Sequence, residues 1–273
     1  MRFWGSRPKC RAEYPTILES EQMAPNSSNL DKKTVDGFGD EWTRFDQSTV
    51  PEEESRSLFE SYFAVFPWQD LPANAVGFDA GCGTGRWAKW VAPRVGHLHC
   101  IDPSEAIEVA SKHLAGIANV SLHKASIEEM PLADSSMDFG YSLGVLHHIP
   151  DTQAAMRDCV RKVKIGAPFL VYLYYRFDNR PAWFRMIWKA SDLARRAIAV
   201  QPHWLRYQLS QIAALLLYWP IARSALLAEK LGANVDNWPL SSYRDKTFYM
   251  MRTDALDRFG TRLEHRFTKQ EIK

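Results

Sequence analysis

The chain has 273 residues, of which 46% are hydrophobic and 24% are charged. This length and composition are typical of one globular domain of about 150–250 residues with additions. The net charge is only +2 and the basic residues form short clusters, which argues against nucleic acid as a partner. The four cysteines show neither a CxxC pair nor the spacing of metal ligands, so we expect no metal site and a reducing, cytoplasmic compartment.

The first 35 residues are polar and interrupted by prolines, and we expect this segment to be disordered. Its basic start lacks the apolar core of a signal peptide. After Pro51, the acidic run at 52–54 favours the start of a helix, because carboxylates interact well with the positive end of the helix dipole. Pro67 is expected to end that helix.

From residue 75 to 175 the chain alternates between short apolar runs and segments with helical spacing. The predicted strands cover 75–79, 98–101, 120–123, 138–143 and 168–175, and the predicted helices cover 85–94, 105–116 and 152–163. Strands separated by helices of about ten residues imply right-handed crossovers and therefore a parallel sheet. The fifth run is apolar throughout, which is typical of a strand covered on both faces.

Residues 176–235 interrupt this alternation with a long helical segment rich in Trp, Leu and Arg. Its most apolar stretch, 212–222, has only 11 residues, whereas a helix needs about 20 to span a bilayer. We therefore expect no spanning helix here. Two stripes with helical spacing are Trp183, Phe184, Ile187 and Trp188, and Leu205, Leu209, Ile212 and Leu216. The last segment, 236–273, is only weakly patterned.

A glycine-rich turn, FDAGCGTGRW at 78–87, follows the first predicted strand. In a parallel sheet ligands bind at the carboxyl ends of the strands, where such a turn lies. The spacing is G-x-G-x-G after Asp79, and Arg86 stands where a dinucleotide-binding motif has its third glycine, which argues against NAD. Asp102, 23 positions after Asp79, ends the second strand and can accept hydrogen bonds from both ribose hydroxyls, although Asp-Pro-Ser is also a common turn and helix cap.

Together these segments resemble the motifs of class I S-adenosylmethionine (SAM) dependent methyltransferases. FDAGCGTGRWAKWVA resembles their first motif, and IDPSEAIEVASKHL is similar to their acidic second-strand motif. ASIEEMPLADSSMDFGYSLGVLHHIPD resembles the third and fourth segments, best known in the ubiquinone/menaquinone-biosynthesis-like branch. VRKVKIGAPFLVYLYY is similar to the fifth-strand region, and FGDEWTRFD to a lead-in of some members. The resemblance covers about residues 75–175 and implies an α/β, Rossmann-like doubly wound sheet with parallel strands in the order 3-2-1-4-5.

The resemblance also implies SAM as the cofactor and indicates which residues hold it. The residues expected to line the cofactor are Asp79, Gly81, Gly83, Gly85, Asp102, Pro103, Ser126, Ile127 and Leu143. Asp102 would hold the ribose, and Pro103 and Ile127 would contact the adenine. Ser126 departs from the family, which usually has Asp beside the adenine amine. A hydroxyl accepts that hydrogen bond less strongly than a carboxylate does, so we expect a weaker contact there.

Methyl transfer from a sulfonium is an in-line displacement in which the enzyme mainly aligns the acceptor and excludes water. A general base is needed only where the acceptor must lose a proton. His147 and His148 are the catalytic candidates, although this pair also shapes the pocket in many family members. We predict an enzyme that methylates O, N or C of a small, apolar-bodied acceptor. The alternatives are a SAM-binding regulatory or assembly protein without catalysis and, less in keeping with the motif, an NAD-dependent oxidoreductase.

We divide the chain into a disordered segment (1–35), a SAM-binding core (36–175), a helical insertion or lid (176–235) and a C-terminal segment of the core (236–273). The insertion is interpreted as core packing, as a lid over an apolar acceptor pocket, or as a membrane-surface face that includes Arg195, Arg196 and Arg206. A full sheet of this family ends in an antiparallel hairpin beside the fifth strand. The last segment leaves no room for it, so we expect that hairpin to be missing and the fifth strand to lie at or near an edge. The sequence does not indicate the oligomeric state.

Overall fold

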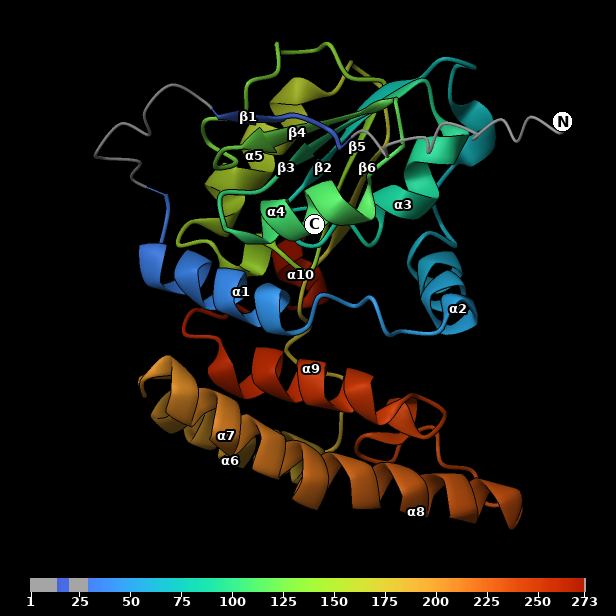
Figure 1. The fold of residues 1–273 in the computed structure, drawn as a ribbon. Coiled ribbons are helices and arrows are strands. Elements are labelled where there is room, and N and C mark those ends of the chain that lie inside the picture. The colour runs from blue at the N-terminus through green and yellow to red at the C-terminus, as the bar shows by residue number, and fades with distance from the viewer. Residues whose placement is uncertain (1–13, 20–28, 273) are drawn as a thin grey trace, which may run out of the picture.

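The computed structural model describes residues 14–19 and 29–272, and within them the centre is a sheet of six parallel strands (Figure 1). The strands are β1 (Ile17–Glu19), β2 (Val76–Ala80), β3 (His97–Ile101), β4 (Val120–Lys124), β5 (Phe139–Leu143) and β6 (Phe169–Tyr172). Their spatial order is β1-β4-β3-β2-β5-β6. The order of the five expected strands is confirmed. From β2 the chain adds strands first toward one edge of the sheet (β3, β4) and then toward the other (β5, β6). Between β2 and β5 this makes a switch point, which opens a crevice for ligands at the carboxyl ends of the strands.

The helices follow the expected alternation and then extend it. They are α1 (Lys32–Arg44), α2 (Glu52–Tyr62), α3 (Ala88–Val91), α4 (Ala106–His113), α5 (Thr152–Lys162), α6 (Ala182–Ala199), α7 (His203–Ala213), α8 (Trp219–Lys230), α9 (Phe248–Gly260) and α10 (Lys269–Ile272). Short 3-10 turns cover Trp68–Asp70, Ala92–Arg94, Leu146–His148 and Ser241–Tyr243, and a π-helical turn covers Ala214–Tyr218.

The expectation that residues 1–35 are disordered is wrong for two parts of that segment. Residues 17–19 form the edge strand β1, in which Ile17 pairs with Leu122 of β4, and α1 begins at Lys32. The Ser111 hydroxyl also donates a hydrogen bond to the Pro15 carbonyl at 3.2 Å. A strand of three residues is too short to show a hydrophobic period, so only its pairing with β4 reveals it. Residues 1–13 and 20–28 lie outside the described part of the chain.

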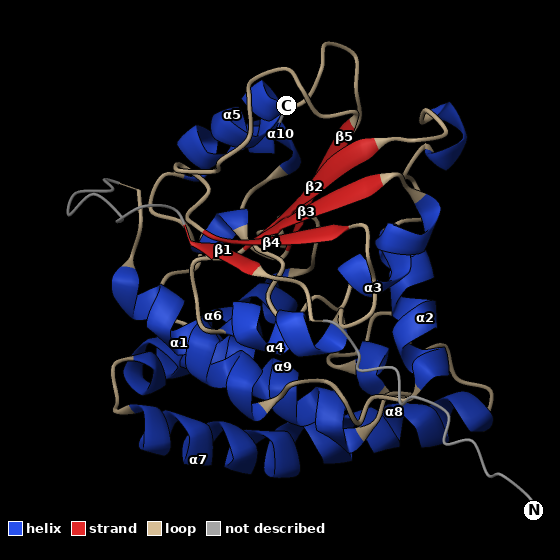
Figure 2. Cartoon of the chain, turned by 45° about the horizontal axis from the view of Figure 1, so that its top comes forward, coloured by secondary structure: helices blue, strands red, loops and turns tan. Residues whose placement is uncertain are grey.

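Both faces of the sheet are covered, as expected for a doubly wound fold (Figure 2). Successive side chains of a strand point to opposite faces. Phe78 of β2 packs toward α5, in a buried cluster that includes Cys159. Tyr141 of β5 packs on the other side, in a cluster that includes Phe59 of α2 and Ile107 of α4.

The helical insertion expected after the fifth strand forms a separate layer. In Figure 1, α9 lies beyond α1 from the sheet, and α6, α7 and α8 lie beyond α9. Ala214, Tyr218 and Ala222 of the α7–α8 region pack against Met251, Ala255 and Phe259 in a buried cluster of their own.

Helices α7 and α8 join through the π-helical turn into one 28-residue helix, His203–Lys230. The sequence-based count of 11 apolar residues therefore underestimates this element. Its mean hydropathy reaches 1.4 over 18 residues, and by length and composition alone it is the one helix in the described residues that could cross a bilayer. Pro220 lies two residues after the π-helical turn, and both features interrupt the regular hydrogen bonds of an α-helix, so the irregularity is confined to one place and the helix continues to Lys230.

The chain returns to the sheet after α9. The Phe267 N–H donates to the Tyr174 carbonyl at 2.9 Å, and the Arg176 N–H donates to the Phe267 carbonyl at 3.0 Å. This makes a parallel bridge beside the end of β6, between Tyr175 and Phe267. Residues 236–272 contain no antiparallel strand pair, and β6 is the last strand of the sheet on that side, as expected.

Candidate functional site

A cavity of about 580 Å³ lies at the carboxyl ends of the strands, between the sheet and helices α1 and α9. This volume falls in the range of about 300–1,000 Å³ that is common for small-molecule sites. The strand ends contribute the segments 81–84, 102–104, 126–128, 143–145 and 172–175 to its wall. The cavity therefore occupies the crevice that the switch point between β2 and β5 creates.

The glycine turn after β2 forms one wall of the cavity and is tied to the neighbouring strand. The N–H groups of Gly81 and Cys82 donate to the Ile101 carbonyl at 2.8 and 3.0 Å. Gly81 has a φ of +80°, and a Cβ placed there would lie 2.4 Å from Cγ1 of Val145. Only glycine fits both the backbone conformation and this close approach. The packing of Val145 against Gly81 thus fixes the turn, which forms a cradle in the cavity wall.

Asp102 lies in the cavity wall and also orders the loops around it. One carboxylate oxygen accepts a hydrogen bond from the Gly83 N–H at 2.8 Å. The other accepts from the Ser104 N–H at 2.9 Å and from the Ser104 hydroxyl at 2.6 Å. A carboxylate offers about four lone-pair sites, so these three bonds leave capacity for a further donor. The turn-and-cap interpretation and the ribose interpretation of Asp102 are therefore compatible.

Asp79 lies behind the glycine turn rather than in the cavity wall. Its side chain is buried, and neither carboxylate oxygen has a hydrogen-bond partner in the described residues. Burial raises the pKa of the Asp79 carboxyl to about 8. At neutral pH this carboxyl is therefore mostly protonated and uncharged.

This pKa gives a testable pH dependence of stability. The folded pKa of Asp79 lies above the ordinary value of about 3.9, so between pH 4 and 8 the folded state keeps a proton that the unfolded state has released. The Asp79 contribution to the unfolding free energy therefore falls as pH rises through this window. As pH rises from 4 to 8, we expect the unfolding free energy of Asp79→Asn to increase relative to that of the parent protein by about 1 kcal/mol or more. Above pH 8 this difference should stay constant. Urea denaturation of both proteins at several pH values measures this; parallel curves would contradict it.

The two candidate catalytic histidines have different surroundings. His147 is fully buried, is absent from the cavity wall and stacks on Tyr174 with ring centroids 3.9 Å apart. Neither of its ring nitrogens has a hydrogen-bond partner in the described residues, and burial holds its pKa well below the usual value. The expectation that His147 can act on an acceptor is therefore not supported, because the 3-10 turn directs its side chain into the core.

His148 does line the cavity. Its Nδ1 lies 2.7 Å from the Leu263 carbonyl, which can only accept, so Nδ1 carries the proton and Nε2 has the free lone pair. That Nε2 atom has no partner in the described residues. Burial lowers the pKa of His148, so the ring is neutral at physiological pH and able to accept a proton.

The structure brings most of the predicted cofactor residues together. Those that line the cavity are Gly81, Gly83, Asp102, Pro103, Ser126, Ile127 and Leu143. Asp79 and Gly85 lie behind the wall. The Ser126 hydroxyl caps the following turn, where it accepts from the Glu129 N–H at 3.2 Å and donates to the Glu129 carboxylate at 3.3 Å. Ser126 can still accept a hydrogen bond from a ligand, but its proton is already used.

Two walls of the cavity come from helices that the sequence motifs did not indicate as site elements. Helix α1 contributes an apolar face with Phe38 and Trp42, which fits the lead-in resemblance of FGDEWTRFD. Helix α9 contributes Asp254 and Asp257, three residues apart. Asp257 accepts a hydrogen bond from the Tyr174 hydroxyl at 2.6 Å, and burial raises the pKa of Asp254 to about 6.

Aromatic side chains from α2, from the end of β6 and from the helical layer line much of the cavity. These rings are Tyr62, Tyr172, Tyr174, Tyr175, Phe177, Tyr218 and Tyr243. Arg86 reaches in from the turn, with its guanidinium 5.5 Å from the ring centre of Trp42 and 4.4 Å from that of Trp87. Such contacts hold a cation on aromatic faces. The single dipeptide Arg86-Trp87 was the only sequence signal for this arrangement.

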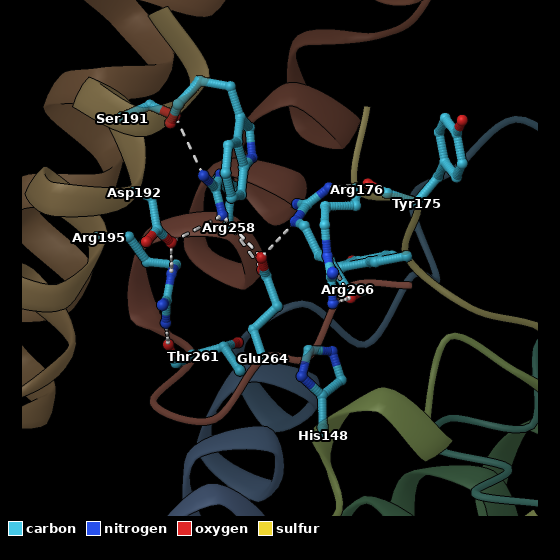
Figure 3. Close-up of polar contacts among 12 residues, drawn as sticks. His148, Tyr175, Arg176, Ser191, Asp192, Arg195, Arg258, Thr261, Glu264 and Arg266 are labelled. Atoms are coloured by element: carbon cyan, nitrogen blue, oxygen red, sulfur yellow. Dashed lines mark hydrogen bonds and ion pairs between the residues drawn. The ribbon is translucent and has the colours of Figure 1, made fainter. Parts of the chain in front are cut away.

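A buried network of arginine and glutamate side chains lies behind the α9 wall of the cavity (Figure 3). Glu264 accepts hydrogen bonds from Arg258 at 3.0 Å and from Arg266 at 2.7 Å, and only 2% of its side chain is exposed. Arg258 also donates to the Ser191 hydroxyl at 3.1 Å, and Arg195 donates to the Thr261 carbonyl at 2.9 Å. These bonds join α6, α9 and the returning C-terminal segment, and they fix Arg258 and Arg266 on the cavity wall.

The fold and the cavity define an α/β protein with a cofactor crevice at the switch point of its sheet. Residues 78–171 match a family model described as a methyltransferase domain. The chain is 35% identical over 113 residues to a ubiquinone biosynthesis O-methyltransferase of Hahella chejuensis, a match that covers 40% of this chain and 45% of that protein. It is 31% identical over 100 residues to the uncharacterized methyltransferase YcgJ of Bacillus subtilis, covering 36% of this chain and 40% of that one. The chain thus spans less than half the length of these two relatives.

The crystal structure of YcgJ from Bacillus subtilis superposes on 54% of this chain and 60% of that one, with a TM-score of 0.43 and 22% identity. The family resemblance drawn from the motifs is confirmed over the matched residues. Residues 78–171 therefore resemble a methyltransferase domain, and these matches support the motif-based expectation of SAM as the cofactor.

Proposed function

We propose that this chain transfers a methyl group from SAM to O, N or C of a small, apolar-bodied acceptor that binds in the same cavity. The observation that carries the proposal is that the glycine turn and Asp102, inside the matched domain, line one cavity together with the aromatic side chains of β6 and the helical layer. SAM supplies an activated methyl group on a sulfonium, so the chain mainly has to align the acceptor and exclude water.

The residues present fit this cofactor. The glycine turn 81–84 lines the cavity where the methionyl part would lie, and Asp102 keeps a lone pair for a ribose hydroxyl. Pro103 and Ile127 flank the place expected for the adenine. Arg86 adds a cation beside the turn.

The acceptor end is built by the helical layer and β6. Its tyrosine rings shield the reacting atoms from water, and Asp254 supplies a carboxylate that orients a polar group of the acceptor. Where the acceptor must lose a proton, we propose His148 as the group that takes it, because its Nε2 has a free lone pair and its Nδ1–H is held by the Leu263 carbonyl.

The cofactor assignment is tested by replacing Asp102. We expect Asp102→Ala to weaken SAM binding by about 1.5–3 kcal/mol, the range for a hydrogen bond to a charged group. Calorimetric titration with SAM measures the effect. Ser104→Ala is the matched control, because it removes one hydrogen bond to Asp102 but leaves the carboxylate and should keep the parent affinity. Equal SAM affinity in the Asp102→Ala and parent proteins would refute the ribose assignment.

We also propose that the chain makes peripheral contact with a membrane through its helical layer. An apolar-bodied acceptor partitions into lipid, so a lipid surface is where such an acceptor would be met. The exposed apolar side chains of α6–α8 support this part of the proposal.

A further inference from the structure

Exposed apolar side chains are concentrated on the helical layer. Of the 22 large hydrophobic residues that are exposed in the described part of the chain, 13 lie between residues 182 and 231. Monomeric proteins rarely expose apolar patches of this kind without a partner. The layer is also the outermost one, farthest from the sheet (Figure 1). Its outer surface is therefore available for contact with something apolar.

Helix α6 presents an apolar stripe with cations beside it. Trp183, Met186, Leu193 and Val200 are all exposed, and their spacings of three, seven and seven residues place them on one face. Arg185, Lys189 and Arg196, at spacings of four and seven residues, form an exposed row along the edge of this stripe. Arg196 pairs with Asp192 at 2.9 Å, while Arg185 and Lys189 have no ion-pair partner in the described residues. Arg185 and Lys189 are thus free to meet external negative charge.

The middle of the long helix 203–230 has no charged side chain from residue 207 to 222. The two arginines that border this stretch both point inward: Arg206 donates to the Gly260 carbonyl at 2.9 Å, and Arg223 donates to the Arg244 carbonyl at 2.7 Å. The exposed positions from 212 to 219 carry Ile212, Leu215, Leu216, Leu217 and Trp219. The bond to Gly260 and the packing of Ala214 and Ala222 on α9 hold the helix against the rest of the chain.

We propose that the α6–α8 surface docks on an anionic lipid bilayer. The apolar face enters the boundary between headgroups and acyl chains, and the row Arg185, Lys189 and Arg196 contacts the lipid phosphates. The exposed indoles of Trp183, Trp204 and Trp219 suit this depth, because tryptophan favours the membrane interface. A bilayer supplies both the apolar layer and the negative charge that the two parts of the surface require. The inference is independent of methyl transfer, since lipid binding is measured without turnover.

Vesicle flotation of the full chain tests the proposal. We expect binding to phosphatidylcholine vesicles that contain 30 mol% phosphatidylglycerol, and much weaker binding to pure phosphatidylcholine or in high salt (about 0.5 M). Leu193→Glu and Leu216→Glu, at exposed positions, should each weaken binding roughly tenfold or more. Val160→Glu, at an exposed apolar position on α5, is the matched control and should bind as the parent does.

The cation row is tested in the same way. Lys189→Gln should weaken binding to the anionic vesicles about fivefold, whereas Arg157→Gln, an exposed cation on α5, should have no effect. Unchanged secondary structure and melting temperature show that the variants fold. If the parent chain binds neither the anionic vesicles nor the pure phosphatidylcholine vesicles, the proposal is wrong. A concentration-dependent dimer in solution that Leu216→Glu abolishes would also overturn it, because a second copy of the chain would then be the partner of this face.

Discussion

Replacing Gly81 with alanine is expected to abolish SAM binding and to lower the unfolding free energy by about 2–4 kcal/mol. The alanine would have to adopt a φ of +80°, which strains an L-residue, and its Cβ would overlap Cγ1 of Val145 at 2.4 Å. The turn must therefore shift, and the cradle for the methionyl part of the cofactor is lost. We expect SAM affinity to fall by more than about 100-fold, because misplacement of a preorganised site costs binding as well as stability. Calorimetric titration and urea denaturation measure the two effects.

Gly166→Ala separates the two causes. Gly166 has a φ of +81°, but a Cβ there would meet no atom within 4 Å, and the residue lies outside the cavity wall. This variant should lose about 1–2 kcal/mol of stability and no SAM affinity. In the double variant Gly81→Ala/Val145→Ala the closest overlaps disappear, so part of the affinity should return. If Gly81→Ala binds SAM as well as Gly166→Ala does, the cradle is not a cofactor site.

Replacing Glu264 with glutamine is expected to lower the unfolding free energy by about 3–5 kcal/mol, the usual cost of removing one partner from a buried ion pair. Glutamine retains an oxygen that can accept a hydrogen bond, but it leaves Arg258 and Arg266 without their shared negative charge. The side chains of these arginines are only 14% and 12% exposed, so water compensates little. Chemical denaturation followed by two independent probes measures the loss.

Glu229→Gln is the matched control for this ion network. Glu229 pairs with Arg244 at 2.9 Å, but 43% of its side chain is exposed. Surface pairs of this kind contribute about 0–1 kcal/mol, so the control should be close to the parent protein. Equal stability of the two glutamine variants would show that the network does not hold the α9 wall in place.

The central sheet could be predicted because its strands are short apolar runs separated by helical spacing and followed by recognisable turns. The same motifs located Gly81, Gly83 and Asp102 at the strand ends, where the structure places them around one cavity. Strand β1 could not be predicted, because its three residues carry no hydrophobic period and form a strand only through pairing with β4.

The acceptor end of the cavity could not be predicted from the sequence. Asp254 and Asp257 lie on α9, in a segment with weak patterning, and they reach the cavity only because the helical layer folds back over the strand ends. Another long-range contact distinguishes His148 from His147. The Leu263 carbonyl that orients the His148 ring lies 115 positions away in the sequence. Motif spacing carries no information about such contacts.

The length of the helix 203–230 was underestimated for a different reason. In the sequence the apolar run 212–222 lies between Gln211 and Arg223, and a count of apolar residues stops at these two. In the folded chain the helix continues in both directions, and the Arg206 and Arg223 guanidinium groups bind backbone carbonyls on the inner side, so the exposed positions from 212 to 219 are all apolar. Side-chain direction, rather than composition, defines this surface.

Transfer of a labelled methyl group from SAM to low-mass compounds in a cell extract tests the proposed function most directly. With the parent chain, we expect label in a compound that organic solvent extracts from water, because the aromatic rings that line the cavity suit an apolar-bodied acceptor. With Gly81→Ala at equal concentration, we expect no label in that fraction. SAM that binds the parent chain in titration but donates no methyl group to any extract component would contradict the proposed function, because the cavity would then hold the cofactor without catalysing its reaction.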